Sequence, residues 1–248
     1  SLHDALPIWG GDVCQRPGED GDLGPAGAQH RQLGMVLEGG GGLAVGVGHG
    51  MAKLGRHSPT IVNAAWGEIF MWDGRLATLE EQVLGPIQAA GEMNMPLEQL
   101  MERLTSIGEY KPLFAAAFPQ EGMSSKTLAK AIATYERTVV SERAPFDSWI
   151  EGNEKAISEE AKRGFAVFNG KALCSSCHEG WNFTNDGFQD IGLPSKDVGR
   201  GEFMPGVVKM QHAFKTPGLR EIARKAPDAV VLDLGLPDMD GSEVLEKA

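Results

Sequence analysis

The 248-residue sequence predicts a mainly α-helical fold with long loops. Several segments place apolar residues at helical spacing directly after residues that start helices. Runs of β-branched residues are few, and glycine and proline recur between Glu179 and Phe214. We therefore expect helices up to about residue 170 and, after Glu179, loops that wrap a cofactor.

The first two expected helices are indicated by their N-terminal residues. Thr78 and Glu81 fit a capping box in front of the apolar run LEEQVLGPI, in which each side chain binds a backbone N–H of the first turn. Pro96 can start the second helix, since its fixed φ suits the first helical position. The apolar residues that follow Pro96 fall at i, i+3, i+4 and i+7, so they lie on one face of that helix.

Two more helices are expected nearer the middle of the chain. Ser124 or Ser125 can cap KTLAKAIATYERTVV, whose apolar residues again share one face. Ser158 precedes Glu159 and Glu160, and acidic residues are favoured at a helix N-terminus by the helix dipole. This last helix leads directly into the most informative motif of the chain.

The composition limits the classes of partner. There are 34 acidic and 23 basic residues, which give a formal net charge of −11. This excess argues against nucleic acid as a partner and favours the docking of a small basic protein. No apolar run approaches the roughly 20 residues that span a bilayer. Residues 1–20 lack the basic and apolar regions of a signal peptide.

The segment Cys174–His178, CSSCH, is a C-x-x-C-H motif. Its two cysteines, Cys174 and Cys177, can form thioethers with a porphyrin, and His178 is then held beneath the iron as the proximal ligand. A zinc site would need about two more ligands, and the only other cysteine is Cys14. A thioredoxin-like site expects a βαβ setting, whereas the flanks here read as helix and loop. The leading interpretation is a covalently attached c-type haem.

The two ends of the chain differ in composition from the rest. Residues 1–42 are rich in Gly, Pro and Asp without apolar periodicity, and residues 1–8, SLHDALPI, look like translated sequencing adapter. Residues 228–248 resemble the third strand and following loop of a response-regulator receiver domain, with Asp233 at the phospho-acceptor position. The other parts of a receiver site are absent, so a signalling role is the weakest hypothesis. We interpret both ends as foreign segments.

Residues 43–227 resemble the di-haem cytochrome c peroxidase family, which includes the MauG-type enzymes. The phrases that carry the resemblance occur in order: GRHSPTIVNAAW at 55–66, MWDGRLATLEEQVLGPIQAAGEM at 71–93, PFDSWIEG at 145–152 and HAFKTPGLREIARKAP at 212–227. The resemblance implies cytochrome c-like helical haem domains. Residues 43–155 would be the remnant of the N-terminal, peroxidatic domain with inter-domain helices, and residues 156–227 a truncated C-terminal haem domain.

The resemblance also implies a reaction. Electrons from a small donor protein, a cytochrome c or a cupredoxin, would enter the C-terminal haem and pass to the N-terminal haem, where hydrogen peroxide is reduced to water. Family members act in the periplasm and are often homodimers. The cofactor is haem c, two per chain in the family.

Specific residues match family positions. The 174–178 motif matches the attachment site of the C-terminal haem. Trp72 matches the tryptophan between the two haems, and His49 matches the loop histidine that binds the peroxidatic iron in the resting enzyme. Glu92 matches the distal glutamate, which moves a proton between the two peroxide oxygens. Taken alone, these three would pass for a core aromatic, a surface histidine and a solvated carboxylate; the family phrases favour the functional roles.

Two departures concern metal and haem binding before residue 60. A first C-x-x-C-H is expected roughly fifteen to twenty residues before His49, but only Cys14 and His30 lie upstream. His57 stands where the family usually carries an asparagine ligand of calcium. Because imidazole is a poor ligand for calcium, a calcium ion is the weaker cofactor expectation.

A third departure follows Pro227, where the family sequence stops before the distal ligand of the C-terminal haem. Met204 or Met210 could ligate the iron by default, and His212 is interpreted as structural or near the haem edge. The chain as written is therefore expected to be an incomplete peroxidase with one covalent haem. The alternatives are a single-haem electron-transfer protein and a MauG-type oxidase of a partner protein. His49 argues against the latter, because MauG-type enzymes lack a histidine in that role.

Overall fold

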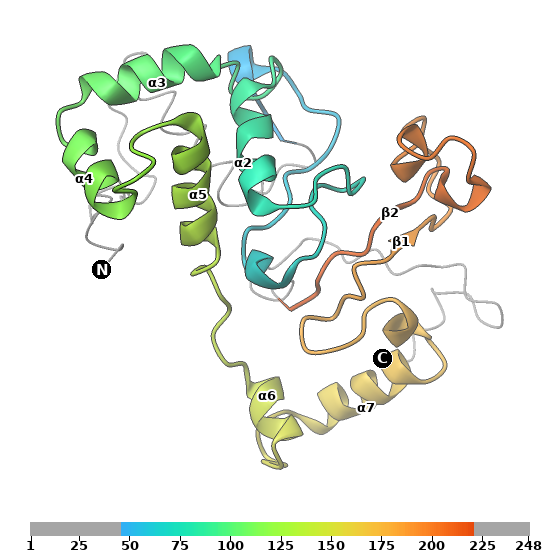
Figure 1. Ribbon diagram of the computed structural model, residues 1–248. Helices are drawn as coiled ribbons and strands as arrows, with labels where there is room; N and C mark the ends of the chain where they lie inside the picture. Colours follow the sequence, from blue (N-terminus) through green and yellow to red (C-terminus); the bar gives the residue numbers. More distant parts are fainter. Residues whose placement is uncertain (1–45, 221–248) are drawn as a thin grey trace, which may run out of the picture. The chain divides into compact units, whose positions relative to one another are not determined.

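The computed structural model describes residues 46–220 (Figure 1), and Cys14, His30, Asp233 and our interpretation of the two ends lie outside this range. The described part is helical, which confirms the mainly α prediction. Its α-helices are α2 (Leu79–Gln88), α3 (Leu97–Ser106), α4 (Tyr110–Ala117), α5 (Ser125–Glu136), α6 (Pro145–Ile150) and α7 (Glu159–Asn169). The short 3-10 helices are η3 (His49–Met51), η4 (Ala64–Trp66), η5 (Cys174–Ser176), η6 (Arg200–Glu202) and η7 (Val208–Met210). Within the described range, no helix is long and apolar enough to cross a membrane.

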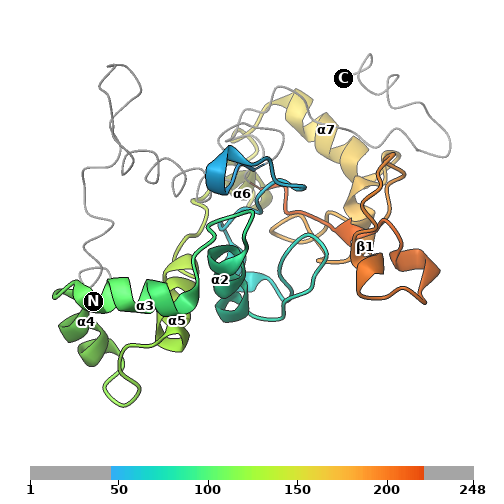
Figure 2. The ribbon, with the colours of Figure 1, turned by 90° about the horizontal axis from the view of Figure 1, so that it is seen from above.

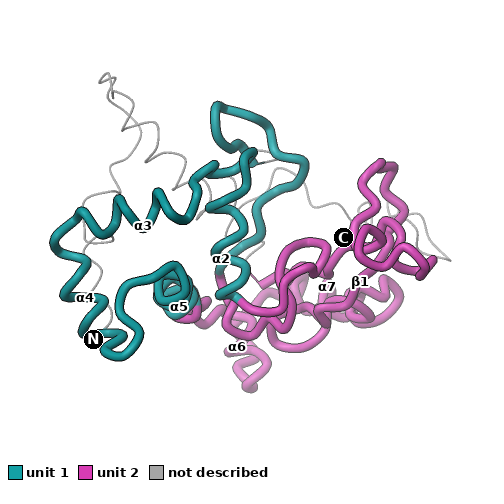
Figure 3. Tube along the Cα trace, turned by 45° about the horizontal axis from the view of Figure 1, so that its top comes forward, with its two compact units in different colours: residues 1–61, 79–136 teal, residues 62–78, 137–248 magenta. Residues whose placement is uncertain are grey.

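The chain divides into two compact units (Figure 3). Of the described residues, the first contains 46–61 and 79–136, and the second contains 62–78 and 137–220. Residues 62–78 thus belong with the later part of the chain. The haem-domain boundary expected after residue 155 differs from this division and stays a proposal.

The first unit is built around the pair α2 and α5, which lie side by side in Figures 1 and 2. Val83 and Ile87 of α2 and Ala129 of α5 form the buried core. Ala133, one turn after Ala129 on the same face of α5, is also buried, and such small side chains allow two helices to approach closely. Partly buried apolar residues surround this core: Leu84, Met93, Met95, Leu97, Leu100 and Ile132.

The helix starts agree with the sequence, but one helix end does not. α3 begins directly after Pro96, and α7 is capped by Ser158, whose Oγ accepts the N–H of Ala161 at 3.2 Å. α5 begins at Ser125, and Ser124 Oγ accepts the N–H of Thr127 at 3.2 Å. The expectation that α5 continues through its terminal valines was wrong, since it ends at Glu136.

In the second unit, five aromatic side chains bind α6, α7 and the loop after the C-x-x-C-H motif together. Phe146 and Trp149 of α6 contact Phe165 of α7 with ring centroids 5.0 and 5.5 Å apart. The loop residue Phe183 meets Phe146 at 5.5 Å and Phe168 of α7 at 6.0 Å. Most of these contacts are edge-to-face or tilted, the arrangements that the ring quadrupole favours.

Residues 177–213 form loops, as the glycine and proline content predicted. Their regular elements are the short helices η6 and η7 and the strand β1 (Phe188–Gln189), which pairs antiparallel with β2 (Phe214–Lys215). In this pair Phe188 lies opposite Lys215, and Gln189 lies opposite Phe214. The pair joins the segment after the C-x-x-C-H motif to the segment that ends the described range.

Candidate functional site

The C-x-x-C-H motif lies in a tight turn directly after α7. Leu173 enters the turn in the left-handed conformation, with φ 54°. The N–H groups of Cys177 and His178 both donate to the carbonyl of Cys174, at 3.3 and 2.9 Å. The turn therefore brings the two half-buried thiols and the imidazole into one short segment.

The imidazole of His178 is oriented by a backbone carbonyl. Its Nδ1 lies 3.0 Å from the carbonyl oxygen of Phe183. Because a carbonyl only accepts, Nδ1 donates in this hydrogen bond, which leaves Nε2 as the nitrogen that can bind a metal. Two thiols and a histidine with a defined tautomer are the donor set that a c-type haem requires, so the residues present fit this cofactor.

Hydrogen bonds from distant segments stabilise the loop of residues 179–184, which supplies this carbonyl. Thr184 Oγ1 donates to the carbonyl of Thr216 at 2.6 Å. The Asn182 side-chain oxygen accepts from Asn63 Nδ2 at 3.1 Å. Asn63 is buried, and its side-chain Oδ1 accepts the N–H of Ser141 at 2.9 Å. These bonds join segments that are far apart in sequence, and motif reasoning did not identify them.

An apolar pocket of about 390 Å³ lies beside this loop within the second unit. Aromatic rings form much of its wall, and an ion pair between Asp147 and Arg220 lies at its edge. Arg220, first by its hydrogen bond, holds the pKa of the Asp147 carboxyl below its ordinary value, and the N–H of Ala144 adds to this effect. The residues that line the pocket are Phe146, Asp147, Ile150, Glu151, Phe165, Gly180, Trp181, Phe183 and Arg220.

Trp72 also belongs to the second unit and is half-buried. Hydrogen bonds from two other segments hold the backbone at Trp72 and at the two residues that follow it. The carbonyl of Trp72 accepts the N–H of Lys215 at 2.8 Å, and Arg200 Nη1 donates to the carbonyls of Asp73, at 2.9 Å, and Gly74. Sequence reasoning missed Arg200, because it acts on backbone oxygens more than a hundred residues away.

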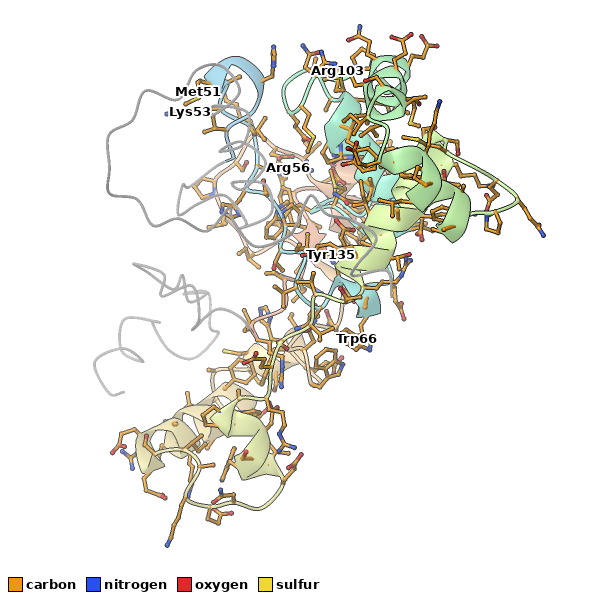
Figure 4. All side chains as sticks on the ribbon, turned by 90° about the vertical axis from the view of Figure 1, so that its left-hand side faces the viewer. Met51, Lys53, Arg56, Trp66, Arg103 and Tyr135 are labelled. Carbon is orange, nitrogen blue, oxygen red and sulfur yellow. The ribbon has the colours of Figure 1, made fainter. Side chains whose placement is uncertain are left out.

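His49 and Glu92 both belong to the first unit, where their loops meet. The N–H of His49 donates to the carbonyl of Glu92 at 2.6 Å. The side chain of His49 is exposed and that of Glu92 half-buried. In Figure 4 the labels Met51 and Lys53 mark the His49 loop. The contact joins the backbones of the two candidate residues, whose catalytic roles remain predictions.

The two glycines beside His49 differ in their surroundings. A Cβ on Gly48 would lie 1.8 Å from the carbonyl oxygen of Gly91, whereas Gly50, at φ +63°, has nothing within 4 Å of its Cβ position. Gly48 is therefore required for the close approach of the two loops. Only the Gly50 side has the open space that a moving loop would use.

The remaining candidate ligands are spread over several segments. His57 Nδ1 lies 2.8 Å from the carbonyl oxygen of Ser58, and His212 Nδ1 lies 2.9 Å from that of Asp197. Met204 is exposed and Met210 half-buried, and their ligation of iron stays a prediction. Over residues 46–220, no three His, Cys, Asp or Glu side chains are grouped so as to hold a metal ion.

Comparison with known sequences gives a consistent result. Residues 30–155 match the sequence model of a family described as di-haem cytochrome c peroxidase. The chain is 54% identical over 175 residues to the methylamine utilization protein MauG of Methylophilus methylotrophus, covering 69% of this chain and 52% of that protein. It is 49% identical over 189 residues to MauG of Methylorubrum extorquens, covering 75% and 54%. It is 37% identical over 195 residues to the cytochrome c551 peroxidase of Pseudomonas aeruginosa, covering 73% and 55%. The chain thus spans about half the length of these relatives.

Solved structures support the same fold. A MauG-like protein associated with microbial copper homeostasis superimposes with a TM-score of 0.66 at 27% identity, covering 83% of this chain and 65% of that one. The diheme peroxidase BthA of Burkholderia thailandensis gives a TM-score of 0.63 at 21% identity, covering 90% and 62%. The latter likeness concerns the fold alone.

Proposed function

Because this chain belongs to the di-haem cytochrome c peroxidase family, we propose that the whole protein reduces hydrogen peroxide to water. The balanced reaction takes two electrons from a small donor protein and two protons, and yields two molecules of water. The observation that supports it best is the C-x-x-C-H turn, in which the His178 tautomer is set by the Phe183 carbonyl at 3.0 Å. When bound, haem c supplies the iron and the electron storage for this chemistry.

Each candidate residue has a defined task in this proposal. Cys174 and Cys177 would hold the haem covalently, and His178 would bind the iron through Nε2. Glu92 accepts a proton from one peroxide oxygen and delivers it to the other, which then leaves as water. His49 would bind the peroxidatic iron in the resting state, and Trp72 would serve electron transfer between the haems.

We further propose the periplasm as the place of action, from the resemblance to the family. We propose a small basic cytochrome or cupredoxin as the electron donor, since the chain carries a net charge of −11. The sequence holds a single C-x-x-C-H. We therefore expect one covalent haem in this chain, which alone would not turn over peroxide. Calcium binding is the weaker proposal, because His57 replaces the expected asparagine. Homodimer formation is proposed from the resemblance alone.

Haem stoichiometry tests the site directly. The chain is expressed together with a c-type maturation system, and covalent haem is measured as the pyridine haemochrome per mole of protein. One haem per chain is expected, and none in the matched Cys174→Ser, Cys177→Ser double variant. Absence of haem in the unmodified chain would overturn the site, and two haems would overturn the expectation of a single site.

The catalytic proposal is tested in a protein that carries both haems. There, Glu92→Gln keeps the shape of the side chain but cannot transfer the proton, so peroxide turnover should fall by about 10²–10⁴-fold. A Glu98→Gln variant serves as the control, because Glu98 is an exposed carboxylate in the first turn of α3. Equal turnover of the two variants would contradict the role of Glu92.

A second candidate function is MauG-type oxidation of side chains in a partner protein. It is favoured by the identities of 54% and 49% to two MauG proteins, against 37% to a cytochrome c551 peroxidase. His49 argues against it, for the reason given from the sequence. In the whole protein with both haems, steady-state oxidation of a reduced cytochrome c by peroxide discriminates the two functions, since the peroxidase proposal requires fast turnover with such a donor.

A further inference from the structure

We propose that Arg220 is a positioning residue for the haem ligand His178, acting through the loop of residues 179–184. This inference rests on the proposed haem site at 174–178. It assigns to an arginine 42 positions beyond the ligand the task of holding the carbonyl that sets the basicity of the imidazole.

One residue of the loop, Phe183, has an unfavourable backbone conformation. Gly180 and Phe183 both adopt the left-handed conformation, at φ 69° and 53°. For Phe183, a residue with a Cβ, this conformation costs about 1–2 kcal/mol. Local bonds close the loop, among them Phe183 N–H to the Gly180 carbonyl at 3.2 Å and Thr184 N–H to the Glu179 carbonyl at 2.9 Å. Contacts from outside the loop add to these local bonds in stabilising the conformation that places the Phe183 carbonyl at His178.

Arg220 provides the most extensive of these contacts. Its Nη1 donates to the carbonyl of Trp181 at 2.8 Å. Its guanidinium also lies 5.5 Å from the centre of the Trp181 ring, within the range of a cation–π contact. Trp181 is thus held at both its backbone and its side chain, two residues before the carbonyl that His178 uses.

Arg220 is itself fixed from two other segments. Its Nη2 donates to both carboxylate oxygens of Asp147, at 2.6 and 2.5 Å, and its Nε donates to Ser141 Oγ at 3.1 Å. The side chain is only 13% exposed. All three nitrogens are engaged, and the planar guanidinium makes their directions interdependent. A lysine would keep the charge but could not make these three contacts together.

The consequence concerns the electron donation of the ligand. A hydrogen bond from Nδ1 to a carbonyl raises the basicity of a metal-bound imidazole. If the Phe183 carbonyl moves away, Nε2 becomes a weaker donor. The ferric state is then stabilised less, so the reduction potential of the haem rises.

The experiment compares Arg220→Lys with Arg143→Lys in the haem-loaded chain. Arg143 is a suitable control, because it pairs with Glu151 in the same unit and is 63% exposed. The iron–histidine stretching frequency is measured by resonance Raman spectroscopy of the ferrous protein after photolysis of its carbon monoxide complex. The midpoint potential is measured by spectroelectrochemistry. Arg220→Lys should lower the frequency and raise the potential, whereas Arg143→Lys should change neither.

The haemochrome assay distinguishes failure of the proposed haem site from failure of the positioning role of Arg220. If the unmodified chain carries no covalent haem, the proposed function of this site fails. If it carries haem and Arg220→Lys changes neither the frequency nor the potential, the positioning role is overturned, even if the melting temperature falls. Should Arg220→Lys not fold, Ser141→Ala removes the acceptor of the Nε bond, together with the acceptor of one Asn63 Nδ2 bond, and leaves the Arg220–Asp147 ion pair in place. The same two shifts are then expected at smaller size, and their absence overturns the proposal.

Discussion

Replacing Gly74 by alanine should destabilise the second unit by about 2–5 kcal/mol, because two separate effects add. Gly74 is buried at φ +64°, a conformation that costs a residue with a Cβ about 1–2 kcal/mol. The added methyl would also lie 2.2 Å from Cζ of the Phe188 ring and 3.0 Å from Arg200 Nη1. Such overpacking typically costs about 1–3 kcal/mol. Since Gly74 follows Trp72 by two residues, the substitution should also displace the Trp72 backbone.

The matched control is Gly192→Ala in the same unit. Gly192 has φ +76° but nothing within 4 Å of the Cβ position, so only the conformational cost of about 1–2 kcal/mol applies. Urea unfolding followed by tryptophan fluorescence gives both free energies of unfolding. A Phe188→Leu background, which removes the far end of the ring, should recover part of the loss caused by Gly74→Ala. Equal losses for the two glycines, or no recovery in that background, would refute the argument from ring overlap.

Three further perturbations test the helices and the ion pair. Ser158→Ala removes the cap of α7 and should cost about 1 kcal/mol of unfolding free energy; no loss in urea unfolding would contradict the capping role. Thr127 is fully buried, and its Oγ1 donates to the Gly122 carbonyl and accepts the Ser124 N–H, both at 2.8 Å. Thr127→Val should therefore cost about 1–3 kcal/mol, and Thr127→Ser, which keeps the hydroxyl, should cost less. Arg220 lowers the pKa of Asp147 in the folded protein. The ionised carboxylate of Asp147 therefore contributes its full stabilisation of the fold above the unfolded carboxyl pKa of about 3.9, and this contribution is lost as the pH falls through the folded-state pKa. The stability difference between the unmodified chain and Asp147→Asn should accordingly narrow below about pH 5 in urea unfolding, and a constant difference down to pH 3 would exclude this linkage.

Helices were predictable where a local start signal precedes an apolar periodicity. Pro96 and Ser158 gave the starts of α3 and α7 correctly. α4 was not predicted, because its eight residues, YKPLFAAA, contain a proline and follow no side-chain cap. α6 has only six residues, and its N-terminus depends on Asp147, which accepts the N–H of Ala144 at 2.8 Å.

The end of α5 was not predictable, because it depends on a residue far away in sequence. The periodicity of KTLAKAIATYERTVV continues to Val139, yet the helix ends at Glu136. The carbonyl of Val139 instead accepts the N–H of Asn63 at 2.9 Å. Asn63 also binds Ser141 through its side chain. A tertiary contact thus outweighs local helix propensity over the last residues.

In the candidate site, the reactive residues could be predicted from the sequence, but the groups that orient them could not. Cys174, Cys177 and His178 were identifiable because their chemistry depends on residue type and spacing. The group that orients His178 is a backbone carbonyl of Phe183, and every residue has such a carbonyl. Arg200 and Arg220 likewise act on carbonyls of distant segments, so no spacing in the sequence marks them.

The backbone around the ligand explains why these distant residues matter. Leu173, directly before the motif, and Phe183, which orients its histidine, both have positive φ values of 54° and 53°. Neither residue favours this conformation, and each costs about 1–2 kcal/mol. The turn and the loop can be stable only if other contacts offset that cost, and the bonds from Asn63 and Arg220 reach the loop from outside. The geometry of His178, the proposed iron ligand, therefore depends on contacts from several distant segments of the second unit. Transferring residues 170–185 alone to another helical protein should preserve haem attachment but not the Nδ1 hydrogen bond of His178.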